Sequence, residues 1–310
     1  MKKNTSSKTI TGKEYEKTAT RVSWVSIIGN SALSLIKLLA GIIAHSGAMI
    51  SDAVHSASDV FSTIIVMIGV KISARDADED HPYGHERFEC VAAILLSAVL
   101  AVTGLMIGSS AVLSIIERET SDITVPGLPA LIAAAVSIIC KEAMYWYTRH
   151  YALLLDSGAL MASAWHHRSD ALSSIGTAVG IGGAVLLGKR WTVLDPLASV
   201  VVGAFIVKVA IELIGKGIGE LMEKSLPDEV EDEIMRIAAS EPDVIEPHDL
   251  KTRRIGNRYA IELHILMSGD ITLAKAHDHA DSIENQLKEK FGENTHVAIH
   301  MEPKETETAT

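Results

Sequence analysis

One stretch of the sequence carries no charged residue from Val91 to Ile116. A helix needs about 20 apolar residues to cross the roughly 30 Å hydrocarbon core of a bilayer, so this stretch is long enough to span a membrane. Five further apolar stretches run from about Val22 to Ala44, Ala48 to Val70, Leu128 to Tyr147, Ser157 to Leu187 and Leu194 to Ile214. The sequence therefore predicts an α-helical membrane domain of six transmembrane helices over residues 21–223.

The residues after this region are polar, charged and periodic, and they predict a soluble domain over residues 224–304. Val230, Ile234 and Ile237 recur at helical spacing, and two alternating runs flank "IGN" as in a hairpin. An amphipathic helix and a last strand, "THVAIHME", follow. The order α-β-β-α-β predicts a small ferredoxin-like α+β sandwich with its helices on one face of the sheet. Residues 1–20 are expected to form an N-terminal tail, and residues 305–310 a disordered one.

Lysine and arginine in the short loops predict the orientation of the chain in the membrane. The N-terminus is rich in lysine, and the second loop carries Lys71, Arg75 and Arg87, whereas the odd-numbered loops are poorer in both residues. Both termini, and with them the soluble domain, are therefore expected on the cytoplasmic side. The formal net charge of -11 argues against nucleic acid as a partner.

Two copies of H-x-x-x-D lie inside the apolar stretches, His55 with Asp59 and His166 with Asp170. Residues four apart share one face of a helix, so each copy offers an imidazole and a carboxylate to a common point. Two such helices supply two nitrogens and two oxygens, a tetrahedral set that suits Zn²⁺, whereas Mg²⁺ and Ca²⁺ prefer oxygen alone. The alternative is a pair of buried structural histidines with the aspartates as caps or ion-pair partners. Two copies disfavour it, since charges at membrane depth are costly and usually mark a pathway.

Other charges occur in the same apolar stretches. Asp52 lies one turn before His55, where it could be a helix cap or a residue at the mouth of a pore. Lys37, Lys141 and Glu142 could pair structurally or with lipid headgroups, and the sequence assigns them no role.

With these features the chain resembles the cation diffusion facilitators, the family of zinc-type divalent metal/proton antiporters. Six spans, both H-x-x-x-D motifs, the loop "DEDHPYGHERFE" and the α-β-β-α-β tail match in order over roughly residues 15 to 304. The resemblance implies a homodimer in the membrane, in this case the plasma (inner) membrane of a bacterium. It also implies zinc both as substrate and as a structural or regulatory ion of the cytoplasmic part.

The resemblance further implies roles for individual residues. The transport site would be His55, Asp59, His166 and Asp170. Asp78, His81 and His85 match a loop metal site, and the alternative is a solvated acidic turn. Arg87 and Glu223 match a charge pair between membrane and tail. A site bridging two cytoplasmic domains matches His248, His264, His277, His300 and Glu302. These four histidines in so small a domain support it, although unrelated surface histidines are the alternative, and Met301 with Glu302 departs from the Gln and Asp of some members.

The expected function is efflux of Zn²⁺ by proton antiport, regulated by metal in the tail. A histidine binds metal only when neutral, and its ordinary pKa is about 6.5, so protons and zinc compete for such a site. Alternatives are a transporter that prefers Mn²⁺, Fe²⁺, Co²⁺ or Cd²⁺, and a membrane-anchored metal sensor. An enzyme is not expected, because no H-E-x-x-H occurs and four ligands leave no open position on a zinc ion.

Overall fold

The computed structural model describes residues 12–43, 47–117, 128–187 and 194–304, and for some residues next to the gaps it describes the backbone alone. The predicted disordered tail, residues 305–310, lies outside these ranges, as does most of the predicted N-terminal tail. The described chain divides into two compact units, one from Gly12 to Ile218 and one from Gly219 onward. Each unit is described by itself.

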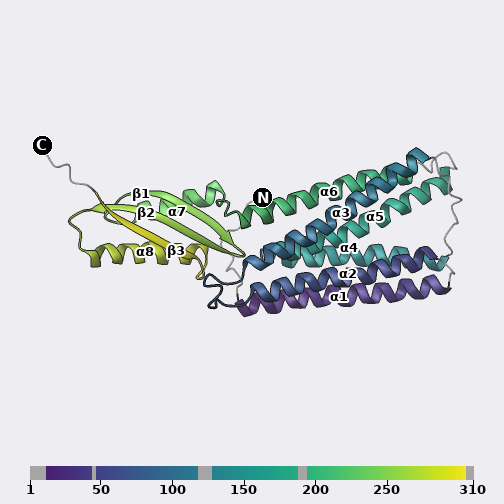
Figure 1. Ribbon diagram of the computed structural model, residues 1–310, viewed down its shortest axis with the longest axis horizontal. Coiled ribbons are helices and arrows are strands. Elements are labelled where there is room, and N and C mark those ends of the chain that lie inside the picture. The colour runs from purple at the N-terminus through teal and green to yellow at the C-terminus, as the bar shows by residue number, and fades with distance from the viewer. Residues whose placement is uncertain (1–11, 44–46, 118–127, 188–193, 305–310) are drawn as a thin grey trace. The chain divides into compact units, whose positions relative to one another are not determined.

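The first unit consists of six long helices that run side by side (Figure 1). Each contains 27 to 32 residues, which at about 1.5 Å per residue is enough to cross a bilayer. The first helix begins eight residues before the predicted end of the N-terminal tail. Their bounds are α1 Gly12–Ile43, α2 Gly47–Ser73, α3 Arg87–Glu117, α4 Leu128–Leu154, α5 Gly158–Leu187 and α6 Leu194–Leu221.

The surface of this unit is apolar and its interior holds polar groups. Ile28, Phe61, Val102 and Ile211 are exposed large apolar side chains on four different helices. The buried residues include aspartate and lysine, which soluble proteins rarely bury. Within the described residues, three helical segments are long and apolar enough to cross a membrane: Lys13–Ile43, Ala53–Ser73 and Arg87–Leu113. The unit is therefore a membrane domain, and the count of six spans stays a prediction.

The second unit has the predicted element order α-β-β-α-β (Figure 1). Strand β1 pairs antiparallel with β2, and β2 pairs parallel with β3, in the order β1-β2-β3. Alternate residues of β2, from Ile261 to Met267, are buried against apolar side chains of both helices. The two helices thus cover one face of the sheet. The elements are α7 Asp228–Ser240, β1 Val244–Ile255, β2 Arg258–Ser268, α8 Leu273–Phe291 and β3 His296–Lys304.

The hairpin between β1 and β2 forms where the sequence predicts it. Ile255 pairs with Arg258, which leaves Gly256 and Asn257 as a two-residue turn. Gly256 has a φ of 58°, a left-handed conformation that glycine adopts without steric cost. This register sets His248 opposite His264, and the parallel pairing sets His264 opposite His300. Three histidines therefore form a row across the sheet, on the face that the helices leave uncovered.

Candidate metal-binding sites

Helices α2, α4 and α5 converge on a buried ionic cluster in the membrane domain. Helix α2 contributes His55 and Asp59, and α5 contributes His166 and Asp170, each pair from adjacent turns of one helix face. His166 Nε2 lies 3.1 Å from Asp59 Oδ1, and His55 Nε2 lies 3.7 Å from Asp170 Oδ1. Each histidine therefore faces the carboxylate of the other helix, so the two motifs meet as the sequence predicts.

Three of these four residues form a compact donor set. One nitrogen of His55 and one oxygen each of Asp59 and Asp170 lie within 4.8 Å of one another. His166 joins the set through its contact with Asp59, and its Nδ1 has no hydrogen-bond partner among the described groups. An imidazole and two carboxylates at this spacing can coordinate a divalent cation, and a second imidazole would complete a tetrahedron.

Lys141 of α4 completes the cluster, and reasoning from the sequence assigned it no role. Its Nζ donates to Asp59 Oδ2 at 2.6 Å and to Asp170 Oδ2 at 2.8 Å. The Lys141 side chain is only 3% exposed. The signal that could have revealed it is its position, a lysine in the middle of an apolar stretch. Lys141 neutralises part of the charge of the two carboxylates, which would otherwise repel each other in a medium of low dielectric constant.

A cavity of about 90 Å³ opens beside this cluster. His55 is the most exposed member, with 54% of its side chain accessible, and it lines the cavity with both aspartates. The other lining residues are mostly hydroxyl-bearing, and one is Lys37, whose Nζ donates to Ser56 Oγ at 2.9 Å. The volume admits several water molecules, and the wall is polar enough to hold them. Asp52 lies in α2, but its side chain is among those that the structure does not describe.

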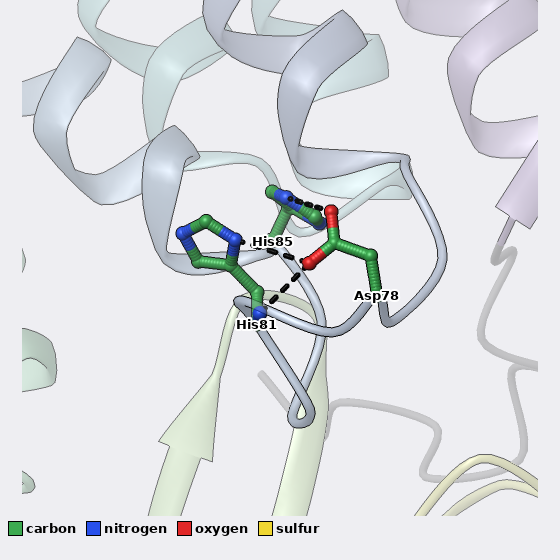
Figure 2. A group of neighbouring side chains, drawn as sticks. All are labelled: Asp78, His81 and His85. Atoms are coloured by element: carbon green, nitrogen blue, oxygen red, sulfur yellow. Dashed lines mark hydrogen bonds and ion pairs between the residues drawn. The ribbon is translucent and has the colours of Figure 1, made fainter.

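The loop between α2 and α3 brings Asp78, His81 and His85 together, as the sequence predicts (Figure 2). Asp78 Oδ1 accepts the backbone N–H of His81 at 2.7 Å, and its Oδ2 lies 3.3 Å from His85 Nε2. The His81 and His85 rings stand 4.3 Å apart. The loop reverses at Gly84, which has a φ of 88°. The two imidazoles and the carboxylate therefore point to a common region.

Two local contacts prepare this loop cluster for a cation. The backbone N–H of His81 lowers the pKa of the Asp78 carboxyl below its usual value, because it stabilises the charged form. His85 Nδ1 lies 3.2 Å from the backbone oxygen of Asp76. A proton on Nδ1 would donate to that oxygen and leave the Nε2 lone pair facing Asp78, which is the arrangement that metal-ligating histidines commonly have. The cluster is therefore a candidate metal site, with a solvated acidic turn as its alternative.

In the second unit, Glu302 lies at the centre of the histidine row. Its Oε1 is 2.9 Å from His264 Nδ1 and 3.6 Å from His300 Nε2, while its Oε2 is 3.2 Å from His248 Nε2. The structure thus brings together four of the residues predicted as ligands, three histidines around the carboxylate of Glu302. His248, His264 and Glu302 have donor atoms within 4.8 Å of one another.

Asp249 is a further member of this cluster that reasoning from the sequence missed. Its Oδ2 lies 3.6 Å from His264 Nε2. The pairing of β1 with β2 is irregular between His248 and Lys251, and Asp249 has a φ of 45°. Such a bulge redirects a side chain, and aspartate tolerates a positive φ better than most residues. The signal in the sequence was the acidic residue directly after His248.

The remaining predicted residues have other surroundings. His277 lies in α8, where its Nε2 is 3.6 Å from Asp281 Oδ2, so the structure does not bring it into the histidine row of its own protomer. Arg87 and Glu223 belong to different units, and their pairing stays a prediction. Within its own unit, Glu223 lies 3.7 Å from Arg253 Nε.

Comparison with known proteins shows which family this chain belongs to. The cation efflux transmembrane domain matches residues 23–222, and the cytoplasmic domain of cation efflux proteins matches residues 226–304. An uncharacterized transporter of Methanocaldococcus jannaschii is 36% identical over 85% of this chain and 91% of its own. The manganese efflux system protein MneP of Bacillus subtilis is 30% identical over 94% of this chain and 98% of its own. Metal tolerance protein C1 of Arabidopsis thaliana is 33% identical over 94% of this chain and 63% of its own.

The family model alone covers more than half of the chain, and relatives match it over nearly their whole length. The cytoplasmic domain is the dimer domain of that family. Its members are transporters, so the expectation that the protein is not an enzyme is confirmed. The expected preference for zinc is not shown, since one relative is named for manganese. The chain is an integral membrane protein that belongs to the cation efflux family of divalent metal transporters, the cation diffusion facilitators.

Proposed function

We propose that the protein exports a divalent metal ion, with zinc as the preferred substrate, in exchange for protons. The observation that carries this proposal is the cluster formed by His55, Asp59 and Asp170, with His166 bonded to Asp59, beside a polar cavity inside an apolar helix bundle. A site of imidazole nitrogen and carboxylate oxygen binds zinc in preference to hard cations, which favour oxygen ligands alone.

Proton coupling follows from the chemistry of the ligands. A metal ion displaces protons from imidazole, and protons displace the metal, so a site that opens alternately to the two sides exchanges one for the other. An inward proton gradient then drives the metal outward, and the membrane potential, worth about 2.3 kcal/mol per net charge per 100 mV, adds to the drive when more than two protons enter for each divalent ion that leaves. In this proposal the membrane domain, residues 21–223, crosses the membrane six times. Both termini therefore lie in the cytoplasm.

The clusters outside the membrane-spanning helices are proposed to act as cytoplasmic metal sites. Glu302 and the three histidines of the sheet face would hold zinc where two cytoplasmic domains of a homodimer meet, and occupancy would report cytoplasmic metal. His277 of a partner could join from outside the protomer. Asp78, His81 and His85 would hold a further ion in the loop. Arg87 and Glu223 would link membrane domain and tail.

Manganese is the second candidate substrate. A relative that is 30% identical is named for manganese efflux, and the compact donor set contains two carboxylates against one imidazole. Harder, oxygen-rich sites favour manganese over zinc.

Metal flux into sealed vesicles tests the proposal. Purified protein in proteoliposomes with an imposed pH gradient should move zinc, and collapse of the gradient should slow it. Manganese, cobalt and cadmium in the same assay rank the substrates. Metal binding without any flux would favour a membrane-anchored sensor instead. Flux of zinc that ignores the pH gradient would overturn proton exchange but retain the transport site.

A further inference from the structure

Lys141 stands between the two carboxylates of the proposed transport site. Each aspartate divides its two oxygens in the same way: one oxygen faces a histidine and the other accepts the ammonium of Lys141. Asp59 uses Oδ1 for His166 and Oδ2 for Lys141, and Asp170 uses Oδ1 for His55 and Oδ2 for Lys141. The lysine therefore joins α2 to α5 through α4.

A cation in this position competes with a metal ion. Lys141 occupies one oxygen of each carboxylate, which leaves a metal fewer lone pairs, and an ammonium ion repels a divalent ion at such short range. Lys141 thus performs in the structure the charge compensation that a bound metal would supply. Two carboxylates buried in a helix bundle without any cation would be costly.

The surroundings offer the ammonium an alternative position. Ser137 lies one turn before Lys141 on α4, and Ser173 and Ser174 lie on α5 next to Asp170, all lining the same cavity. Their hydroxyl oxygens can accept hydrogen bonds from an ammonium group. A lysine side chain has four flexible carbons, so its head can move over several ångströms without any movement of the helix.

We infer that Lys141 is a tethered internal cation that competes with the transported metal for Asp59 and Asp170. It neutralises the site when no metal is bound, withdraws along the cavity when metal enters, and returns to help expel the metal. This inference rests on the proposed transport site. Its consequence is a site that binds metal more weakly and releases it faster than its ligands alone would.

The test compares three variants of the full chain by zinc uptake into proteoliposomes over a range of zinc concentrations. Lys141→Gln should lower KM by about tenfold or more, the size expected when a close charge contact is removed, and should lower kcat as well. Lys141→Arg keeps the charge and should stay nearer to the wild-type KM. Lys208→Gln is the matched control, because Lys208 is a lysine of α6 that faces Glu212 on the surface and is not among the residues lining the cavity, and it should leave KM within about twofold of wild type.

The parallel fall of KM and kcat separates competition from a structural role. A lysine that only holds the helices together would, on removal, lower kcat with an unchanged or raised KM, and that result from a folded variant overturns the inference. A second measurement needs no variant: a small amine-reactive reagent should modify Lys141 of the wild-type protein more when zinc is bound. Equal or lower modification with zinc also overturns it. If the wild-type protein moves no zinc or other divalent metal, the proposed function fails instead.

Discussion

The membrane domain and the cytoplasmic domain hold clusters of the same side chains in opposite environments. In the membrane domain, the carboxylates of Asp59 and Asp170 both contact the buried Lys141, and histidines flank them. On the sheet a single carboxylate, Glu302, lies among three partly exposed histidines, and no lysine or arginine contact to Glu302 occurs among the described ion pairs. Solvent can screen charges on the sheet face, whereas the helix bundle must supply its own compensation.

Under the proposed function, the comparison separates two uses of similar ligands. A carrier site must release its metal on every cycle, so an internal competitor such as Lys141 is useful there. A regulatory site should stay occupied until cytoplasmic metal falls, and a cluster without a buried competing cation suits that purpose. Each prediction below perturbs one side of this contrast.

The largest effect is expected from Asp59→Asn or Asp170→Asn. Each removes a carboxylate that the proposed site uses for both metal and Lys141, so zinc flux should fall by more than the roughly 10- to 100-fold typical of an outer-shell change. Flux in proteoliposomes measures it. Glu142→Gln is a matched control, because Glu142 lies in the same bundle but pairs with Arg168. Wild-type flux in either aspartate variant would contradict the proposed transport site.

The cytoplasmic cluster should respond to Glu302→Gln. This change removes the carboxylate that all three histidines approach, and the zinc affinity of the tail site should fall by roughly 10- to 100-fold. Counting bound zinc on the full-length dimer checks it, while flux at saturating zinc should persist. His277→Ala in parallel decides whether that residue joins a site shared by two protomers. An equal loss of bound zinc supports its place there, and an unchanged count removes it.

Substrate preference should change in His55→Asp. The variant replaces the most exposed ligand of the membrane site by a third carboxylate, which favours oxygen-preferring ions. We expect the ratio of zinc to manganese transport to fall by about tenfold, or about 1.4 kcal/mol. Competition between the two metals in one flux assay measures the ratio. An unaltered ratio would show that ligand type at this position does not select the metal.

The smallest effect concerns the surface of the tail, where Lys275 donates to Asp243 at 2.6 Å. This hydrogen bond lowers the pKa of the Asp243 carboxyl, so its contribution to folding is present above the ordinary value of about 3.9 and is lost as the pH falls through the lower folded value. Lys275→Ala should therefore raise the pKa of Asp243 and reduce the stability of the tail slightly at neutral pH. NMR titration of Asp243 checks the direction. A pKa that stays low would assign the shift to His279 instead.

The element order and the paired motifs could be predicted because their signals are local. An H-x-x-x-D spacing places two side chains on one helix face whatever surrounds the helix, and the "IGN" turn fixes the β1–β2 register through two residues. From these, the sequence by itself determined the α-β-β-α-β domain and the pairing of the His55/Asp59 and His166/Asp170 motifs, while the resemblance to a transporter family pointed to most ligands of the loop and sheet clusters.

The partners of the ligands were decided by tertiary structure alone. Lys141 lies 29 residues from Asp170 and 82 from Asp59, and only the packing of α4 against α5 and of α2 near both brings its ammonium between them. Asp249 reaches His264 because a bulge turns the chain there, and Glu302 lies at the centre of its cluster because β2 and β3 pair in parallel. Contacts between distant segments depend on how whole faces pack, and a spacing of residues along one segment carries no record of that packing.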